Sequence, residues 1–256
     1  GVGDFVSNAD TDAEKAIMFE LQKARPGWGF IMEEGGVIAP EEPDGPCWII
    51  DPLDGTTNYL HGIPHYAISI AAIDKPLNKS GKLIAGGIFD PIRNEFFFAE
   101  PGKGAFLNDR RIRVSGRRVM QDALFATGIP FKGRGDAALH KTFQAELGQV
   151  MAETSGVRRF GSAALDLAWV AAGRYDGFWE HELRIWDIAA GVLIVREAGG
   201  FVSDFASRDR AMQSGDIVVM GGQARLAYHG IDRIKGGSSW LLPNGGRLNL
   251  TLRVAT

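Results

Sequence analysis

Apolar residues follow two different spacings along this chain, and the spacing predicts its elements. Residues 11–24 place Ala13, Ile17 and Leu21 on one helical stripe, which predicts a helix that Asp10 or Thr11 can cap. Shorter β-type runs predict strands at 28–32, 47–50, 66–73, 82–89, 95–100 and 111–114. The connections between the later strands are too short for crossovers, so we expect antiparallel pairing there.

The spacing changes after residue 118, where predicted strands and helices alternate. Strands are predicted at 124–127, 157–160, 178–180, 201–203 and 217–220, and helices at 137–151 and 162–172. A third helix over 187–198 carries Ile188, Val192 and Val195 on an amphipathic pattern. The whole chain therefore predicts a layered α/β architecture, with an antiparallel-rich first half and a β/α-alternating second half.

Composition narrows the class of protein. The chain has 256 residues, 45% hydrophobic and 23% charged, with a net charge of −3, which is typical of a globular protein and less basic than a general nucleic-acid binder. The single cysteine, Cys47, excludes an intrachain disulfide and fits a reducing compartment. No apolar run is long enough for a transmembrane helix and no signal-peptide pattern stands out, so we expect a cytoplasmic protein.

The richest chemistry follows the predicted strand at 47–50. Asp51 and Asp54 come directly after it, and Gly55 and Thr56 follow. Acids at the carboxyl end of a buried strand are badly placed for packing and well placed for a site. The two carboxylates would repel each other unless a cation lay between them. A helix beginning at the Gly-Thr step would offer free N–H groups to an anion, although a plain helix start explains that step equally well.

Five acids stand at element boundaries, namely Asp10, Glu33, Asp51, Asp54 and Asp187. Gathered in one cleft, they would favour a hard cation such as Mg²⁺ or Mn²⁺. Taken singly, an acid at a helix start is more often a cap, and one in a turn is more often solvated. Only the set as a whole predicts metal-dependent phosphate chemistry.

The remaining candidates have simpler explanations. We expect His61 and His65 to make packing or loop contacts, and His181 to lie at the surface. Cys47 is expected to be a small buried hydrophobe. No nucleophile elbow, Walker loop or complete dinucleotide-binding glycine run is found.

Four sequence patches resemble the inositol monophosphatases, a family within the lithium-sensitive, magnesium-dependent phosphatases. The patches are Asp4 to Asp10, Glu33 to Gly35, Trp48 to Tyr59, and Trp186 to Gly191 with Glu197 to Gly200. Order and spacing agree from about residue 3 to residue 231. The resemblance implies the αβαβα sugar-phosphatase fold for a domain over 1–235 that lacks the family's N-terminal helices. Residues 236–256 have no family counterpart, and are expected to be sequence left from cloning or a linker with an edge strand.

The resemblance also implies a role for each site residue. Metal ligands would be Glu33, Asp51, the Leu53 carbonyl, Asp54 and Asp187, for two to three Mg²⁺ ions that Mn²⁺ can replace. Phosphate would bind the backbone N–H groups of Gly55 and Thr56. Thr56 and Asp10 would orient and deprotonate the attacking water, with Glu33 assisting through a third ion. Glu180 would take a substrate hydroxyl pair, and Ser162 and Ala163 would lie beside the substrate ring.

The implied activity is hydrolysis of inositol 1-phosphate or a related small polyol or sugar phosphate by a homodimer. Other activities of the superfamily stay open: fructose-1,6-bisphosphatase, histidinol-phosphatase and nucleotide 3′-phosphatase. Some bacterial relatives instead serve the transcription machinery, with catalysis dispensable, so association with RNA polymerase is a second expectation. No direct nucleic-acid or membrane partner is expected.

Overall fold

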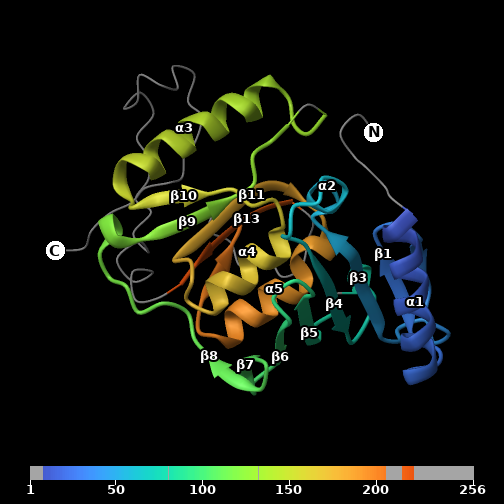
Figure 1. The fold of residues 1–256 in the computed structure, drawn as a ribbon. Helices are drawn as coiled ribbons and strands as arrows, with labels where there is room; N and C mark the ends of the chain where they lie inside the picture. Colours follow the sequence, from blue (N-terminus) through green and yellow to red (C-terminus); the bar gives the residue numbers. More distant parts are fainter. Residues whose placement is uncertain (1–7, 80, 132, 206–214, 222–256) are drawn as a thin grey trace.

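Five alternating layers of helix and sheet make up the protein (Figure 1). The structure is a computed structural model that describes residues 8–79, 81–131, 133–205 and 215–221. Helix α1 (Asn8–Ala24) covers one end of an eight-stranded sheet, two helices fill the middle layer, and α3 (Ala137–Glu153) covers a five-stranded sheet. The predicted αβαβα layering is confirmed, whereas the expectations for residues 4–7 and 236–256 lie outside the described residues.

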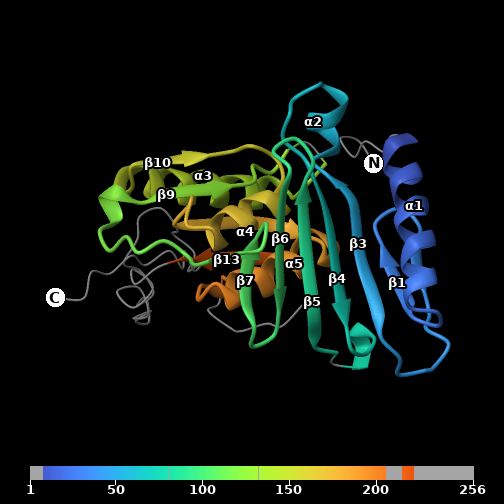
Figure 2. The same ribbon diagram turned by 60° about the horizontal axis from the view of Figure 1, so that its bottom comes forward.

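The larger sheet is mostly antiparallel, as predicted (Figure 2). Its strand order is β2-β1-β3-β4-β5-β6-β7-β8, and the parallel pair is β1 with β3. The strands are β1 (Gly29–Met32), β2 (Gly36–Ile38), β3 (Cys47–Asp54), β4 (Ala67–Ile73), β5 (Leu83–Asp90), β6 (Glu95–Glu100), β7 (Gly104–Leu107) and β8 (Arg110–Ile112). The pattern had not revealed β2, a three-residue edge strand whose residues are all exposed.

The smaller sheet has the mixed pairing that β/α alternation predicts. Its order is β10-β9-β11-β13-β12, parallel across the first three strands and antiparallel across the last two pairs. The strands are β9 (Leu124–Thr127), β10 (Gly156–Arg158), β11 (Gly177–Leu183), β12 (Phe201–Ser203) and β13 (Gly215–Met220). The parallel strands need crossovers, which α3 and α4 (Ala163–Ala171) provide.

Helices α4 and α5 (Ile185–Glu197) form the middle layer and supply most of the main core. Helix α5 contacts strands of both sheets, and its residues from Asp187 to Val195 are all buried. The predicted helix over 187–198 is therefore present, but its amphipathic character is wrong, because a helix between two sheets has no solvent face. The approach is close: a Cβ at Gly86 of β5 would lie 3.0 Å from the Ala190 Cα.

His181 corrects a second expectation, because it is buried and not at the surface. Its Nε2 lies 2.8 Å from Glu146 Oε2 on α3, and its ring stacks on Phe205. On a strand, alternate side chains share a face, so His181 points the same way as Trp179, which packs against Phe143 of α3. Glu180, between them, faces the opposite side of the sheet.

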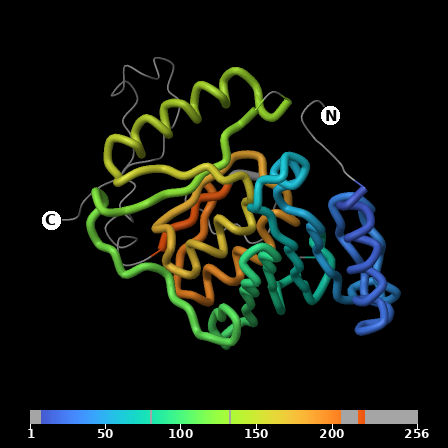
Figure 3. The backbone as a smooth tube through the Cα atoms, viewed as in Figure 1, coloured from blue at the N-terminus to red at the C-terminus, as the bar shows by residue number. Residues whose placement is uncertain are grey.

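Short helical segments complete the described chain, and one of them links its two halves. They are α2 (Thr56–Leu60), η1 (Leu77–Lys79) and η2 (Met120–Asp122). Figure 3 traces the path of the backbone, in which α2 follows β3 and precedes β4. Asn58 of α2 donates 2.7 Å hydrogen bonds to the carbonyls of His65 and Phe160, which ties α2 to the segment entering α4. Within the described residues, no helix combines the length and apolar character needed to cross a bilayer.

Candidate active site

A bulge at the end of β3 brings Asp51 and Asp54 to the same side of the sheet. Asp51 pairs with Ser69 of β4 and Asp54 with Ala67, so three steps on β3 oppose two on β4. In a regular strand, side chains three residues apart would face opposite ways. The extra residue between them cancels that difference, as β-bulges near active sites commonly do.

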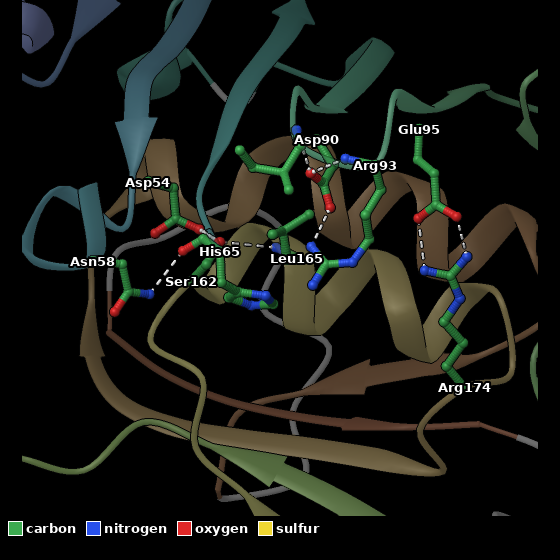
Figure 4. Close-up of polar contacts among 10 residues, drawn as sticks. Asp54, Asn58, His65, Asp90, Arg93, Glu95, Ser162, Leu165 and Arg174 are labelled. Carbon is green, nitrogen blue, oxygen red and sulfur yellow. Dashed lines mark hydrogen bonds and ion pairs between the residues drawn. The ribbon is translucent and has the colours of Figure 1, made fainter. Parts of the chain in front are cut away.

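The N-terminus of α4 holds Asp54. Ser162 Oγ and the Ala164 N–H each donate to Asp54 Oδ2 over 2.6 Å. Figure 4 shows Asp54 pointing towards Ser162 at the start of that helix. A carboxylate is favoured there because the first N–H groups of a helix lack partners within it. Ser162 therefore caps α4 and binds a predicted metal ligand, and Ala163, buried next to it, begins the helix.

Glu33 and Asp187 reach the same pair from two other elements. Glu33 follows β1, which runs parallel to β3, and its carboxyl group hydrogen-bonds to Asp51. Asp187 lies in the first turn of α5, where its Oδ2 accepts the Arg184 N–H over 2.7 Å. The neighbouring Trp186 carbonyl lies 3.3 Å from the hydroxyl of Ser69, the residue paired with Asp51.

Each of these four carboxyl groups has a pKa above its ordinary value. Burial is the largest cause throughout. For Glu33, burial and the charge of Asp187 raise the pKa to about 8; for Asp187, burial and the charge of Asp54 raise it to about 7. The pKa of Asp51 is raised well above normal by burial and by Glu33. The pKa of Asp54 is also raised by burial, although the Ser162 and Ala164 hydrogen bonds oppose the shift.

The four acids could bind a hard divalent cation, because they are oxygen ligands and lie close together. All four supply oxygen ligands, and mutual repulsion is the condition that a bound cation relieves. Among the described residues, no three acidic, histidine or cysteine side chains are already arranged around one point at ligand distance. Glu33 and Asp51 hydrogen-bond to each other instead, and the Leu53 carbonyl oxygen lies 3.1 Å from Thr56 Oγ1.

A hydrogen bond joins Thr56 to Asp10. Thr56 Oγ1 donates to Asp10 Oδ1 over 2.9 Å, across 46 residues of sequence. Helix α1 begins at Asn8, so Asp10 lies inside its first turn and is fully buried. The suggestion that Asp10 caps this helix is wrong, because the helix starts earlier than its apolar stripe.

Gly55 occupies the tight step between β3 and α2. Its φ of +102° is one that other residues rarely adopt. A Cβ here would lie 3.1 Å from the His65 carbonyl oxygen and 3.3 Å from that of Gly161. Glycine thus allows the chain to turn directly after Asp54, and the amides of the α2 start follow at once.

Glu180 of β11 lies near the acid set of Glu33, Asp51, Asp54 and Asp187, since the charges of Asp187 and Asp54 act on it. Its Oε1 lies 3.9 Å from Arg134 Nη1. Burial and the charge of Asp187 raise its pKa to about 8. Gly128 makes room for it: a Cβ at that position would lie 1.9 Å from Glu180 Cδ.

Two charged residues near the site were missed in the sequence. Asp166 of α4 is 1% exposed, and its Oδ1 lacks a hydrogen-bond partner. Its pKa is raised well above normal by burial and by the charges of Glu180 and Asp54. Arg134, the second of these residues, lies in the loop before α3 and has no arginine next to it in the sequence. Neither carries a sequence signal, because an acid in a helix's first turn and an isolated loop arginine are both common at surfaces.

The structure confirms two packing expectations. His65 is buried, with its ring 5.1 Å from that of Phe160 and 5.4 Å from that of Trp169. Burial lowers its pKa to about 4. Cys47 is buried in the main core.

Stability should depend on pH through the site acids when divalent ions are removed. The pKa of Glu33 is about 8 against an ordinary 4.5, and that of Asp187 is about 7 against 3.8. Because the folded state holds extra protons, their contribution is fully present below the ordinary values and is lost as pH rises through the folded ones. In EDTA, the melting temperature should fall between about pH 5 and about pH 8. Added Mg²⁺ should raise it most at the higher pH; equal effects at both would contradict this electrostatic account.

The chain is similar over most of its length to proteins of one known family. Residues 1–231 match the inositol monophosphatase family. An inositol-1-monophosphatase of Mesorhizobium japonicum is 55% identical over 218 residues, covering 85% of this chain and 79% of that protein. The Nus factor SuhB of Pseudomonas aeruginosa is 48% identical over 219 residues, with coverage of 84% and 78%. The crystal structure of extragenic suppressor protein suhB from Bartonella henselae has a TM-score of 0.80 at 53% identity, with coverage of 88% and 84%. The chain therefore belongs to the inositol monophosphatase family.

Proposed function

We propose that this protein is a Mg²⁺-dependent phosphomonoesterase that hydrolyses inositol 1-phosphate or a related small polyol or sugar phosphate. The observation that carries the proposal is the meeting of Glu33, Asp51, Asp54 and Asp187 beside the Thr56–Asp10 hydrogen bond. Family membership supports the phosphomonoesterase class. The name of the Mesorhizobium relative supports the inositol phosphate substrate.

The four acids, with the Leu53 carbonyl, would hold two to three Mg²⁺ ions, or Mn²⁺ in their place. Bound there, the ions would supply Lewis acidity and the positive charge that phosphoryl transfer needs. The protein's part is to keep the acids within reach of one another despite their repulsion. Inhibition by Li⁺ and a cytoplasmic location belong to the same proposal; the single cysteine fits a reducing compartment.

The start of α2 would bind the phosphate group. The backbone N–H groups of Gly55 and Thr56 come first after β3, and the turn brings them next to Asp54. Free amides at a helix start bind anions through hydrogen bonds and the helix dipole. The ester would thus be oriented with its phosphorus close to the acids.

Thr56 and Asp10 would accept the proton that the attacking water releases. Asp10 accepts the Thr56 hydroxyl proton in a hydrogen bond, which leaves the lone pairs of Thr56 Oγ1 to accept one from water. As the water attacks, its proton can pass to Thr56 while Asp10 takes the threonine proton. Asp10 is fully buried, so the proton acceptor at the end of this path lies away from bulk solvent.

Glu180 would recognise the alcohol part of the substrate. A carboxylate accepts hydrogen bonds from two neighbouring hydroxyls, which suits a polyol ring. Its position against Gly128 and its ion pair with Arg134 hold it at the edge of the acid set. Ser162 and Ala163 would border the ring on the α4 side.

Asp54→Asn should abolish Mg²⁺-dependent phosphate release from inositol 1-phosphate. The amide oxygen can still accept from Ser162 and Ala164, so the melting temperature without metal should be kept or slightly raised. Loss of one charged metal ligand should lower kcat at least about a hundredfold, since bound metal supplies several kcal/mol. Asp12→Asn, at a side chain that is 76% exposed on α1, is the control. Near-normal turnover of Asp54→Asn at saturating Mg²⁺ would refute the proposal.

The same variant tests a second function suggested by the relatives named Nus factor SuhB. An accessory role in transcription would be carried by surface contacts with RNA polymerase and not by the acid set. Pull-down with RNA polymerase should then give equal recovery for wild type and Asp54→Asn. Lack of binding by both would exclude this alternative.

Glu180→Gln should change substrate preference more than phosphate binding. An amide accepts fewer hydrogen bonds than a carboxylate, so KM for inositol 1-phosphate should rise, by about tenfold for roughly one lost charged hydrogen bond. A panel with fructose 1,6-bisphosphate, histidinol phosphate, a nucleoside 3′-phosphate and a simple alkyl phosphate measures the change. The alkyl phosphate serves as the control, because it has no hydroxyl pair for residue 180. Equal losses on every ester would contradict the assignment.

We further propose that the protein forms a homodimer through the surface around α2. Tyr59, Leu60, Ile63 and Phe160 are each at least 41% exposed there, and Asn58 joins the segments that carry them. Exposed apolar clusters of this kind mark protein interfaces. Leu60→Asp should therefore yield monomers in sedimentation velocity, whereas Val37→Asp, on the exposed edge strand β2, should leave dimers. A monomeric wild-type protein would contradict the proposed homodimer.

A further inference from the structure

Helix α1 presents two buried carboxylates, one turn apart, to the rest of the protein. Asp10 is 0% exposed and Glu14 is 6% exposed, although acids are rarely buried without a partner. Residues at i and i+4 share one face of a helix. Asp10 reaches Thr56, as described above, and Glu14 is not needed for that contact.

Glu14 reaches the turn after β1. Its Oε2 accepts the Glu34 N–H over 3.0 Å, a contact that spans 20 residues of sequence. The turn also passes close to the carboxyl group, because a Cβ at Gly35 would lie 2.8 Å from Glu14 Oε1. The same Cβ would lie 2.9 Å from Met32 Cε. The glycine thus lets the backbone close around the Glu14 carboxylate.

This turn carries Glu33 into the acid set. The Glu33 N–H donates to the Ile50 carbonyl over 3.2 Å, which continues the pairing of β1 with β3 as far as Glu33. Beyond it, residues 33–35 turn the chain back into the exposed edge strand β2, which pairs antiparallel with β1. The direction of Glu33 therefore depends on how the next residue is held, and α1 lies alongside β1 and β3 (Figure 1).

We propose that Glu14 is a positioning residue that fixes Glu33 at Asp51 by binding the Glu34 N–H. Its effect is on metal affinity, since a ligand held in place loses less conformational freedom on binding. The inference rests on the proposed function in one respect, that Glu33 is a metal ligand. A purely structural role would anchor α1 to the sheet without affecting metal affinity.

Calorimetric titration of the protein with Mn²⁺ tests the proposal. Glu14→Met keeps the length of the side chain and removes its carboxylate, and should raise the Mn²⁺ Kd about ten- to a hundredfold, as loss of an outer-shell partner typically does. Glu14→Gln keeps an acceptor oxygen and should stay within about threefold of wild type. Glu20→Met, at a side chain that is 70% exposed on the same helix, is the matched control. Hydrogen exchange at residues 33–36 should accelerate in Glu14→Met before any metal is added.

Three outcomes would overturn the proposal: an unchanged Mn²⁺ Kd in Glu14→Met, an equal rise in Glu14→Gln, or an equal rise in Glu20→Met. Gly35→Ala gives a second route if Glu14→Met does not fold. The added methyl group would push against the Glu14 carboxylate, so the Mn²⁺ Kd should rise there too, and a wild-type value would also count against the proposal. Wild-type protein that neither binds Mn²⁺ nor releases phosphate would instead refute the proposed function.

Discussion

The main physical constraint on this structure is the repulsion among four carboxyl groups that the fold buries together. Glu33, Asp51, Asp54 and Asp187 come from three different parts of the chain. Burial raises the pKa of all four, and neighbouring acids raise the pKa of Glu33, Asp51 and Asp187 further. The protein offsets part of the cost with directed N–H groups: the start of α4 serves Asp54 and the Arg184 amide serves Asp187. These donors do not neutralise four acids, and the remaining imbalance is what divalent cations can relieve.

The layered fold explains how the acids meet. β1 and β3 run parallel, so Glu33, which follows β1, and Asp51, near the carboxyl end of β3, lie at the same end of these strands. The start of α5 lies beside that end, where Ser69 contacts the Trp186 carbonyl. Glu180 approaches from the smaller sheet. The site therefore lies where the two sheets and the middle helices converge, and every layer except α3 contributes at least one functional side chain.

Elements with strong local patterns could be predicted from the sequence, and features set by distant contacts could not. The strand before Asp51 is an uninterrupted apolar run, and the acids behind it are unusual in any packed interior, so both stood out. The bulge that aligns Asp54 with Asp51 depends on pairing with β4. The burial of His181 depends on α3, and the contact of Glu14 depends on a turn 20 residues away. Roles for Glu180 and Ser162 came from family resemblance alone.

The burial of α5 between the two sheets affects how the protein folds and unfolds. Because α5 contacts strands of both sheets, neither sheet can bury its inner face without this helix. The larger sheet is complete by Ile112, long before α5 appears in the chain. In a nascent chain of that length, the inner face of the larger sheet is still exposed. The sheet becomes fully ordered only after the second half of the chain has been synthesised. Loss of structure should accordingly be a single cooperative event, with no surviving half-molecule.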